Sequence, residues 1–119
     1  MTTTAEIHIA TATGQVSAAG ALLAILSAHR TLPTPAAELV ETRLSGGDLA
    51  WGVRLSLHNG LDHFEQWRTT LCLPAADVDH RHSRSSTLAW LIVTGTVHGV
   101  PVELVGYYHP AATDEEEPS

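Results

Sequence analysis

Two stretches of the sequence alternate apolar and polar side chains as half-buried β-strands do, and glycine interrupts each stretch. In the first stretch, residues 38–44 and 49–58 lie on either side of Gly46 and Gly47. Two consecutive glycines supply the positive φ angles that a two-residue hairpin turn requires. The predicted hairpin register pairs Leu44 with Leu49, Thr42 with Trp51 and Val40 with Val53.

One face of this first hairpin is expected to be buried and the other to be wet, as in an antiparallel sheet that covers a core on one side. The expected buried face consists of Val40, Leu44, Leu49, Trp51, Val53, Leu55 and Leu57. The opposite face consists of Glu41, Arg43, Arg54, Ser56 and His58. The first hairpin is therefore interpreted as ordinary half-buried scaffold.

The second hairpin is predicted from residues 87–97 and 100–108, with His98-Gly99 at the turn. Its core face is predicted to pair Val97 with Val100, Gly95 with Val102, Val93 with Leu104 and Leu91 with Gly106. Its other face is predicted to pair Trp90 with Tyr107, Ile92 with Val105 and Thr94 with Glu103. Unlike the first hairpin, this one is apolar on both faces, so both faces need a cover.

Helical spacing of apolar residues begins near Gln15 and must end before Pro33, whose ring opposes continuation of a helix. The apolar stripe predicted for this helix consists of Val16, Ala19, Leu22, Leu23 and Leu26. A second helix is predicted to begin with Asp62 as its N-cap and Glu65 three residues later, and to end at Leu73-Pro74. Its buried face is predicted to consist of Phe64, Trp67 and Leu71.

The order of elements predicts an α+β fold, with a four-stranded, mainly antiparallel sheet from two β-hairpins and two helices packed on one face. A short strand or arm at residues 6–11 precedes the rest, which gives the order (β)-α-β-β-α-β-β. Residues 75–86 are polar and are expected to form a surface loop. Residues 1–110 are expected to form one domain, and residues 111–119 an acidic, disordered tail.

Composition narrows the class of protein. An apolar fraction of 44% is ordinary for a globular chain, and no apolar run approaches the roughly 20 residues that span a membrane. The formal net charge of −7 disfavours binding to a nucleic-acid backbone. The N-terminus has no signal-peptide pattern. Cys72 is the single cysteine, so the chain cannot form an internal disulfide. Its thiol is expected to be buried and structural. These features favour the cytoplasm.

The densest polar cluster lies at residues 77–84. Asp77, Asp79, His80 and His82 are candidate ligands for a divalent metal, because imidazole and carboxylate groups bind such ions. Two arginines in the same segment, Arg81 and Arg84, would repel a cation. A solvated surface loop is the favoured explanation of the cluster, and no cofactor is assigned to it.

Acid–base chemistry has one further candidate, at the Asn-Gly turn that follows the first hairpin. His58 and His63 lie on either side of this turn, next to Asp62. An Asp-His pair can act as a general acid or base if a nucleophile stands close by. Asp62 already has a sufficient role as the helix N-cap. No nucleophile elbow, phosphate-binding glycine loop or zinc-protease helix is present in the sequence, so no catalytic residue is assigned.

The outer face of the second hairpin gives the best functional clue. Trp90, Ile92, Val105 and Tyr107 would form a contiguous apolar patch there if nothing covered them. The first helix or the N-terminal arm is one candidate cover. The second is another subunit or a protein partner, for which Trp and Tyr are favoured anchors. A ligand groove is the third reading.

Three segments carry a resemblance. They are residues 28–35 (AHRTLPTP), residues 64–68 (FEQWR) and residues 99–107 (GVPVELVGY). In order and spacing they resemble a group of small proteins of Streptomyces-type actinobacteria and their phages. The group implies no activity and no functional residues for this chain.

These observations favour a non-enzymatic, cytoplasmic interaction module that forms a homo-oligomer such as a homodimer, without a cofactor. Trp90, Ile92, Val105 and Tyr107 are its expected interface. The first alternative is a small metal-dependent or His-based enzyme that uses residues 77–84 and His58/His63. The second alternative is a regulatory protein associated with nucleic acid.

Overall fold

The computed structural model describes residues 11–44 and 46–110. Its elements in chain order are α2 (Ala12–Ala28), β1 (Ala36–Arg43), β2 (Leu49–Leu57), α3 (Leu61–Thr70), a 3-10 turn (Ala75–Asp77), β3 (Asp79–His82), β4 (Ala89–Val97) and β5 (Val100–Tyr108). The predicted N-terminal strand, except for its last residue, and the predicted acidic tail lie outside the described residues.

The strands form one five-stranded sheet in the order β1-β2-β5-β4-β3. Each neighbouring pair is antiparallel except β2 and β5, which run parallel, so the sheet is mixed. The α+β class is confirmed, whereas the prediction of four strands was wrong. The fifth strand, β3, comes from the segment expected to be a loop, and all four of its residues are exposed. Its backbone pairs with β4, but it has no apolar residue to produce a strand pattern.

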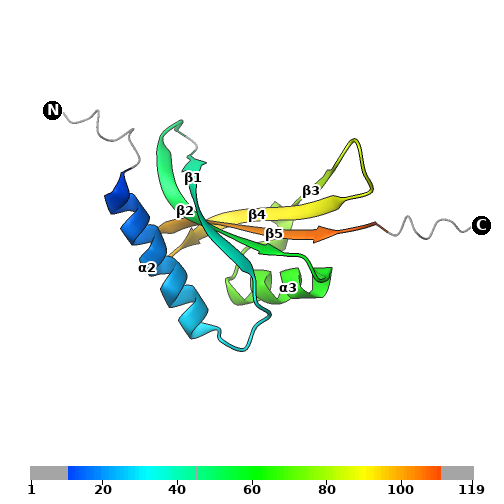
Figure 1. The fold of residues 1–119 in the computed structure, drawn as a ribbon, viewed down its shortest axis with the longest axis horizontal. Helices are drawn as coiled ribbons and strands as arrows, with labels where there is room; N and C mark the ends of the chain where they lie inside the picture. Colours follow the sequence, from blue (N-terminus) through cyan, green and yellow to red (C-terminus); the bar gives the residue numbers. More distant parts are fainter. Residues whose placement is uncertain (1–10, 45, 111–119) are drawn as a thin grey trace, which may run out of the picture.

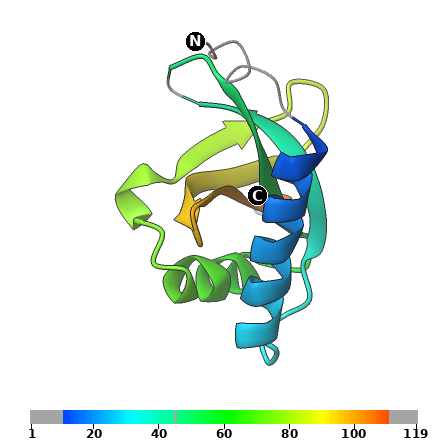
Figure 2. The ribbon, with the colours of Figure 1, turned by 90° about the vertical axis from the view of Figure 1, so that its left-hand side faces the viewer.

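Both helices pack on the same face of the sheet, as predicted (Figure 1). α2 lies against β2, and α3 lies against β5. Between the helices and the sheet lies one core cluster of buried residues: Ala18, Ala21, Ile25, Val53, Leu55, Leu57, Phe64, Trp67, Leu73, Val93, Val100, Val102 and Leu104. Figure 2 shows the sheet curving around the two helices.

The register of the second hairpin is confirmed at every predicted pair, from Val97 opposite Val100 to Trp90 opposite Tyr107. His98 and Gly99 both have positive φ angles, 53° and 76°, as expected for a two-residue turn. The turn and the alternating pattern specify the same register, so the sequence leaves no freedom for a slip.

The register of the first hairpin differs from the prediction by one residue, because Arg43 and not Leu44 lies opposite Leu49. The connection is longer than two residues. The Leu44 amide donates to the Asp48 carbonyl at 2.8 Å, which places Leu44 inside the loop and leaves it 40% exposed. The one-residue shift moves Val40 to the other face of the sheet, opposite Gly52.

The face of α2 that packs on the sheet also differs from the prediction. Ala18, Ala21 and Ile25 are the buried residues of this helix, whereas Val16 and Leu23 are 71% and 68% exposed. From Ala12 to Ala28 the helix contains no charged residue, so no polar side marks which way it should turn. The predicted stripe was therefore wrong for Val16, Ala19 and Leu23, although Leu22 and Leu26 do pack against the core.

α3 begins two residues earlier than expected, at Leu61, because its N-cap is Gly60, with φ 126°, and not Asp62. Asp62 lies within the first turn of the helix, so its predicted capping role was wrong. Phe64 and Trp67 are buried as predicted. The indole Nε1 of Trp67 donates a hydrogen bond of 2.7 Å to the Pro33 carbonyl, which ties α3 to the connector after α2.

Close packing of α3 on β5 requires a residue without a side chain at Gly106. A Cβ there would lie 2.8 Å from the Cβ and Cδ1 atoms of Phe64.

We expect Gly106→Ala to lower the free energy of unfolding by about 1–3 kcal/mol through overpacking. At Gly46, a Cβ would meet nothing within 4 Å, so Gly46→Ala is the matched control, with an expected change within about 0.5 kcal/mol. Urea denaturation measures both, and equal stability of the two variants would refute this packing.

Candidate interaction surfaces

The four residues predicted as an interface lie together on the sheet face opposite both helices. Trp90 and Ile92 lie on β4, directly across from Tyr107 and Val105 on β5. None of the four belongs to the core cluster between the helices and the sheet. Val105 is nevertheless only 2% exposed, and the other three are half-buried. We call these four residues the outer patch.

Aromatic rings from three neighbouring strands cover much of the outer patch. His58 follows β2, whose parallel register places Leu57 beside Gly106 and hence His58 beside Tyr107. The two rings stack with centroids 4.8 Å apart and planes inclined by 5°. Trp90 adjoins Tyr107 on its other side, with centroids 6.0 Å apart. Val105 lies next to this row, two residues before Tyr107 on the same face of β5, and is buried within the single chain.

Ion pairs border the outer patch at both sides. The guanidinium nitrogens of Arg54 on β2 lie 3.3 Å from a carboxylate oxygen of Glu38 and 3.4 Å from one of Glu103. On the edge strand β3, Arg81 lies 2.9 Å from Asp79. Because these arginines already have acidic partners in the chain, the outer sheet face offers little uncompensated positive charge to a phosphate backbone.

The His-rich segment is divided by the pleat of β3. Asp79 lies across from Ile92 on the outer face, whereas His80 lies across from Leu91 on the helix-covered face. The His80 and His82 rings have centroids 4.6 Å apart, and His80 Nε2 is hydrogen-bonded to the Tyr108 hydroxyl. Asp77 lies at the end of the 3-10 turn. Within residues 11–44 and 46–110, no three His, Cys, Asp or Glu side chains converge as a metal site would require.

The structure also separates the residues of the predicted acid–base group, His58, Asp62 and His63. His58 stacks on Tyr107 at the outer sheet face, while Asp62 and His63 lie in the first turn of α3. α3 packs against the opposite, helix-covered face of β5 through Phe64 at Gly106. The structure therefore gives His58 a packing role in the outer patch.

Cys72 is exposed, so the prediction of a buried thiol was wrong. α3 ends at Thr70, and Cys72 follows in the left-handed region with φ 60°. The Cys72 and Leu73 amides donate to the carbonyls of Thr69 and Arg68, which is the hydrogen-bond pattern of a Schellman C-cap. This cap turns Leu73 into the core and directs Cys72 outward.

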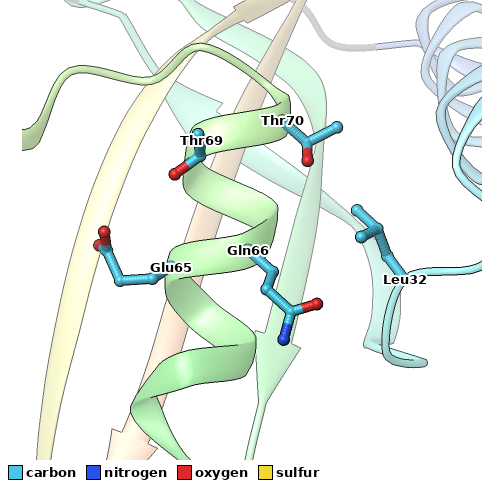
Figure 3. Close-up of a pocket in the computed structure, with 5 residues that line it drawn as sticks. All are labelled: Leu32, Glu65, Gln66, Thr69 and Thr70. Atoms are coloured by element: carbon cyan, nitrogen blue, oxygen red, sulfur yellow. The ribbon is translucent and has the colours of Figure 1, made fainter.

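A shallow pocket of about 380 Å³ lies between α3 and the connector that follows α2, lined by Leu32, Glu65, Gln66, Thr69 and Thr70 (Figure 3). Gln66 and Thr70 point towards Leu32, whereas Glu65 lies on the far side of the helix. Glu65 accepts hydrogen bonds of 2.7 and 2.8 Å from Arg68, and this pairing holds the pKa of the Glu65 carboxyl below its usual value. The exposed lining of the pocket is mainly apolar, and its one carboxylate already has a partner in the chain.

The outward side of α2 is exposed, although the spacing of its apolar residues predicted that it would be buried. It carries Ala12, Val16, Ala19, Gly20, Leu23 and Ser27, all of them exposed. These six residues, the α2 stripe, occupy one side of the helix at spacings of three and four residues. In the part of the chain that the structure describes, no helix is both long and apolar enough to cross a bilayer.

Gly20 lies at the centre of the α2 stripe, and the fold of the single chain does not explain it. A Cβ on Gly20 would meet nothing within 4 Å. Glycine inside a helix is less favourable than alanine by about 1 kcal/mol. Alanine would therefore fit a monomer better than glycine does.

No family model, curated protein or solved structure matches this chain. The resemblance to small actinobacterial and phage proteins stays a prediction. Any functional argument therefore depends on the surfaces described above.

The row of rings over Val105 gives a testable contribution to stability. We expect Tyr107→Ala to lower the free energy of unfolding by about 1–3 kcal/mol, because it removes the stack on His58 and uncovers Val105. Tyr107→Phe keeps the ring and is expected to stay within about 0.5 kcal/mol of the unchanged protein. Urea denaturation at low protein concentration measures both. Equal losses would show that the ring does not cover Val105.

Proposed function

We propose that this protein is a non-enzymatic interaction module that acts as a homo-oligomer in the cytoplasm. The α2 stripe carries this proposal. Val16 and Leu23 expose 71% and 68% of their surfaces on a helix that has no charged residue. Soluble proteins seldom leave continuous apolar surface uncovered unless another molecule binds it.

The α2 stripe is favoured over the outer patch because of how much apolar surface each offers. In the outer patch, Val105 is 2% exposed and its neighbours are half-buried beneath stacked rings and beside ion pairs. The large side chains of the α2 stripe are about two-thirds exposed. The outer patch largely covers itself, whereas the α2 stripe needs a second molecule.

The expected strength of the association follows from the side chains that it would bury. Complete burial of a Val or Leu side chain contributes about 1.5–3 kcal/mol, and two copies bring four such side chains. Association costs about 4–15 kcal/mol in lost translational and rotational freedom. The two quantities are of similar size, so we expect a reversible oligomer that dissociates on dilution.

Leu23→Glu tests this proposal. It places a charge in the middle of the α2 stripe at an exposed position, so we expect the monomer to stay folded and self-association to weaken at least tenfold. Ser17→Glu, at an exposed position of α2 outside the stripe, is the matched control and should associate normally. Sedimentation equilibrium over a range of concentrations measures the constants. A protein that is monomeric at every concentration would refute the proposed function.

Ile92→Glu separates the two surfaces. Ile92 is half-buried in the outer patch, and we expect this variant to self-associate like the unchanged protein. Circular dichroism shows whether it folds, and sedimentation shows whether it associates. If a folded Ile92→Glu variant is monomeric while Leu23→Glu still associates, the outer patch and not α2 joins the copies.

A further inference from the structure

We infer that α2 packs antiparallel against α2 of a second copy, with the two-fold axis between Ala19 and Gly20. This inference rests on the proposed function and specifies how the two copies meet. It uses the α2 stripe and leaves the outer patch free.

The first argument is the symmetry of the stripe. Val16 and Leu23 are equally far along the helix from the midpoint between Ala19 and Gly20, and so are Ala12 and Ser27. In a two-fold interface, if one residue of the first copy contacts a different residue of the second copy, the same two residues also meet with the copies exchanged. Antiparallel pairing about this midpoint therefore places Val16 of each copy against Leu23 of the other.

The second argument is the size of the residues at the centre. Ala19 and Gly20 are the smallest pair in the stripe, and they lie where two crossing helices would come closest. Open space surrounds the position of a Cβ on Gly20, so the described chain leaves room there for the close approach of a second helix. With such small residues at the crossing, flanking Val16 and Leu23 can pack against the facing helix.

The third argument is charge. The chain has a net charge of −7, so two copies repel each other, and they repel least when the surfaces that meet carry no charge. α2 supplies that surface, because no ionisable side chain occurs between Ala12 and Ala28. A charged partner would find no ion pair there, and membrane-surface helices normally carry the basic residues that α2 lacks. A second copy is the occupant that fits.

The position of α2 leaves room for a second helix. Figure 1 shows α2 at one end of the described structure, beside the edge strand β1 and far from the opposite edge strand β3. Figure 2, viewed from that end, shows α2 in front of the strands, with no other helix or strand of the described residues drawn over its outer side. Antiparallel pairing also aligns the two helix dipoles favourably, which parallel pairing does not.

Engineered thiols test the orientation, in a Cys72→Ser background because Cys72 is exposed. Ala19→Cys places a thiol beside the predicted axis, so oxidation should link the two copies. Ala12→Cys places its thiols about 22 Å apart along the antiparallel pair, beyond the roughly 7 Å Cα separation that a disulfide spans. A parallel pair would instead bring the two introduced thiols at position 12 together.

Non-reducing electrophoresis after mild oxidation gives the result, and light scattering before oxidation gives the oligomeric state. Linkage by Ala19→Cys and none by Ala12→Cys is expected. Efficient linkage by Ala12→Cys, or by neither variant while the dimer persists, would overturn the antiparallel inference but leave the proposed function standing. A monomer before oxidation in the Cys72→Ser background would refute both.

Paired charges provide an independent test. Val16→Lys combined with Leu23→Glu should have an association constant at least tenfold higher than that of Leu23→Glu alone. The reason is that each introduced cation faces an introduced anion of the partner. Val16→Glu combined with Leu23→Glu is the matched control and should be monomeric. If the opposite-charge variant associates no better than this control, the helices do not pair antiparallel in this register.

Discussion

Only one side of a helix can face a sheet, and α2 is free of charge on every side. The fold uses the side that carries Ala18, Ala21 and Ile25, all within 5% of complete burial. These small residues let α2 lie close to β2, and at the start of the helix a Cβ on Gly14 would lie 3.2 Å from Trp51. Seating α2 in this way leaves its opposite side in solvent. The proposed association of two copies follows from that constraint.

The outer face of the sheet also carries apolar side chains, and residues of the same chain cover part of them. The last strand, β5, inserts between β2 and β4, so residues from distant parts of the sequence become neighbours. His58 reaches Tyr107 in this way, and the two rings stack on the sheet face that also carries the buried Val105. The parallel pairing of β2 and β5 therefore provides a cover that no local sequence pattern reveals. This is why the outer patch is less open than its composition suggested.

The parts of the fold that could be predicted are those where local signals agree. The second hairpin has an alternating pattern and a compatible His98-Gly99 turn, and its register is correct throughout. The first hairpin has the pattern but a longer loop, which shifts Leu44 out of the ladder. β3 has only polar residues and takes its place through backbone pairing with β4, which its side chains do not signal. The exposed side of α2 was missed because an uncharged helix gives no sign of its orientation.

In an antiparallel pair of α2 helices, Val16 of one copy contacts Leu23 of the other. An isotope-filtered NMR experiment on a mixture of labelled and unlabelled protein detects only contacts between copies. The account predicts intermolecular signals between the methyl groups of Val16 and those of Leu23, with further signals at Ala19. Intermolecular signals confined to Trp90 and Ile92, or from Val16 to Val16 and Leu23 to Leu23, would contradict it.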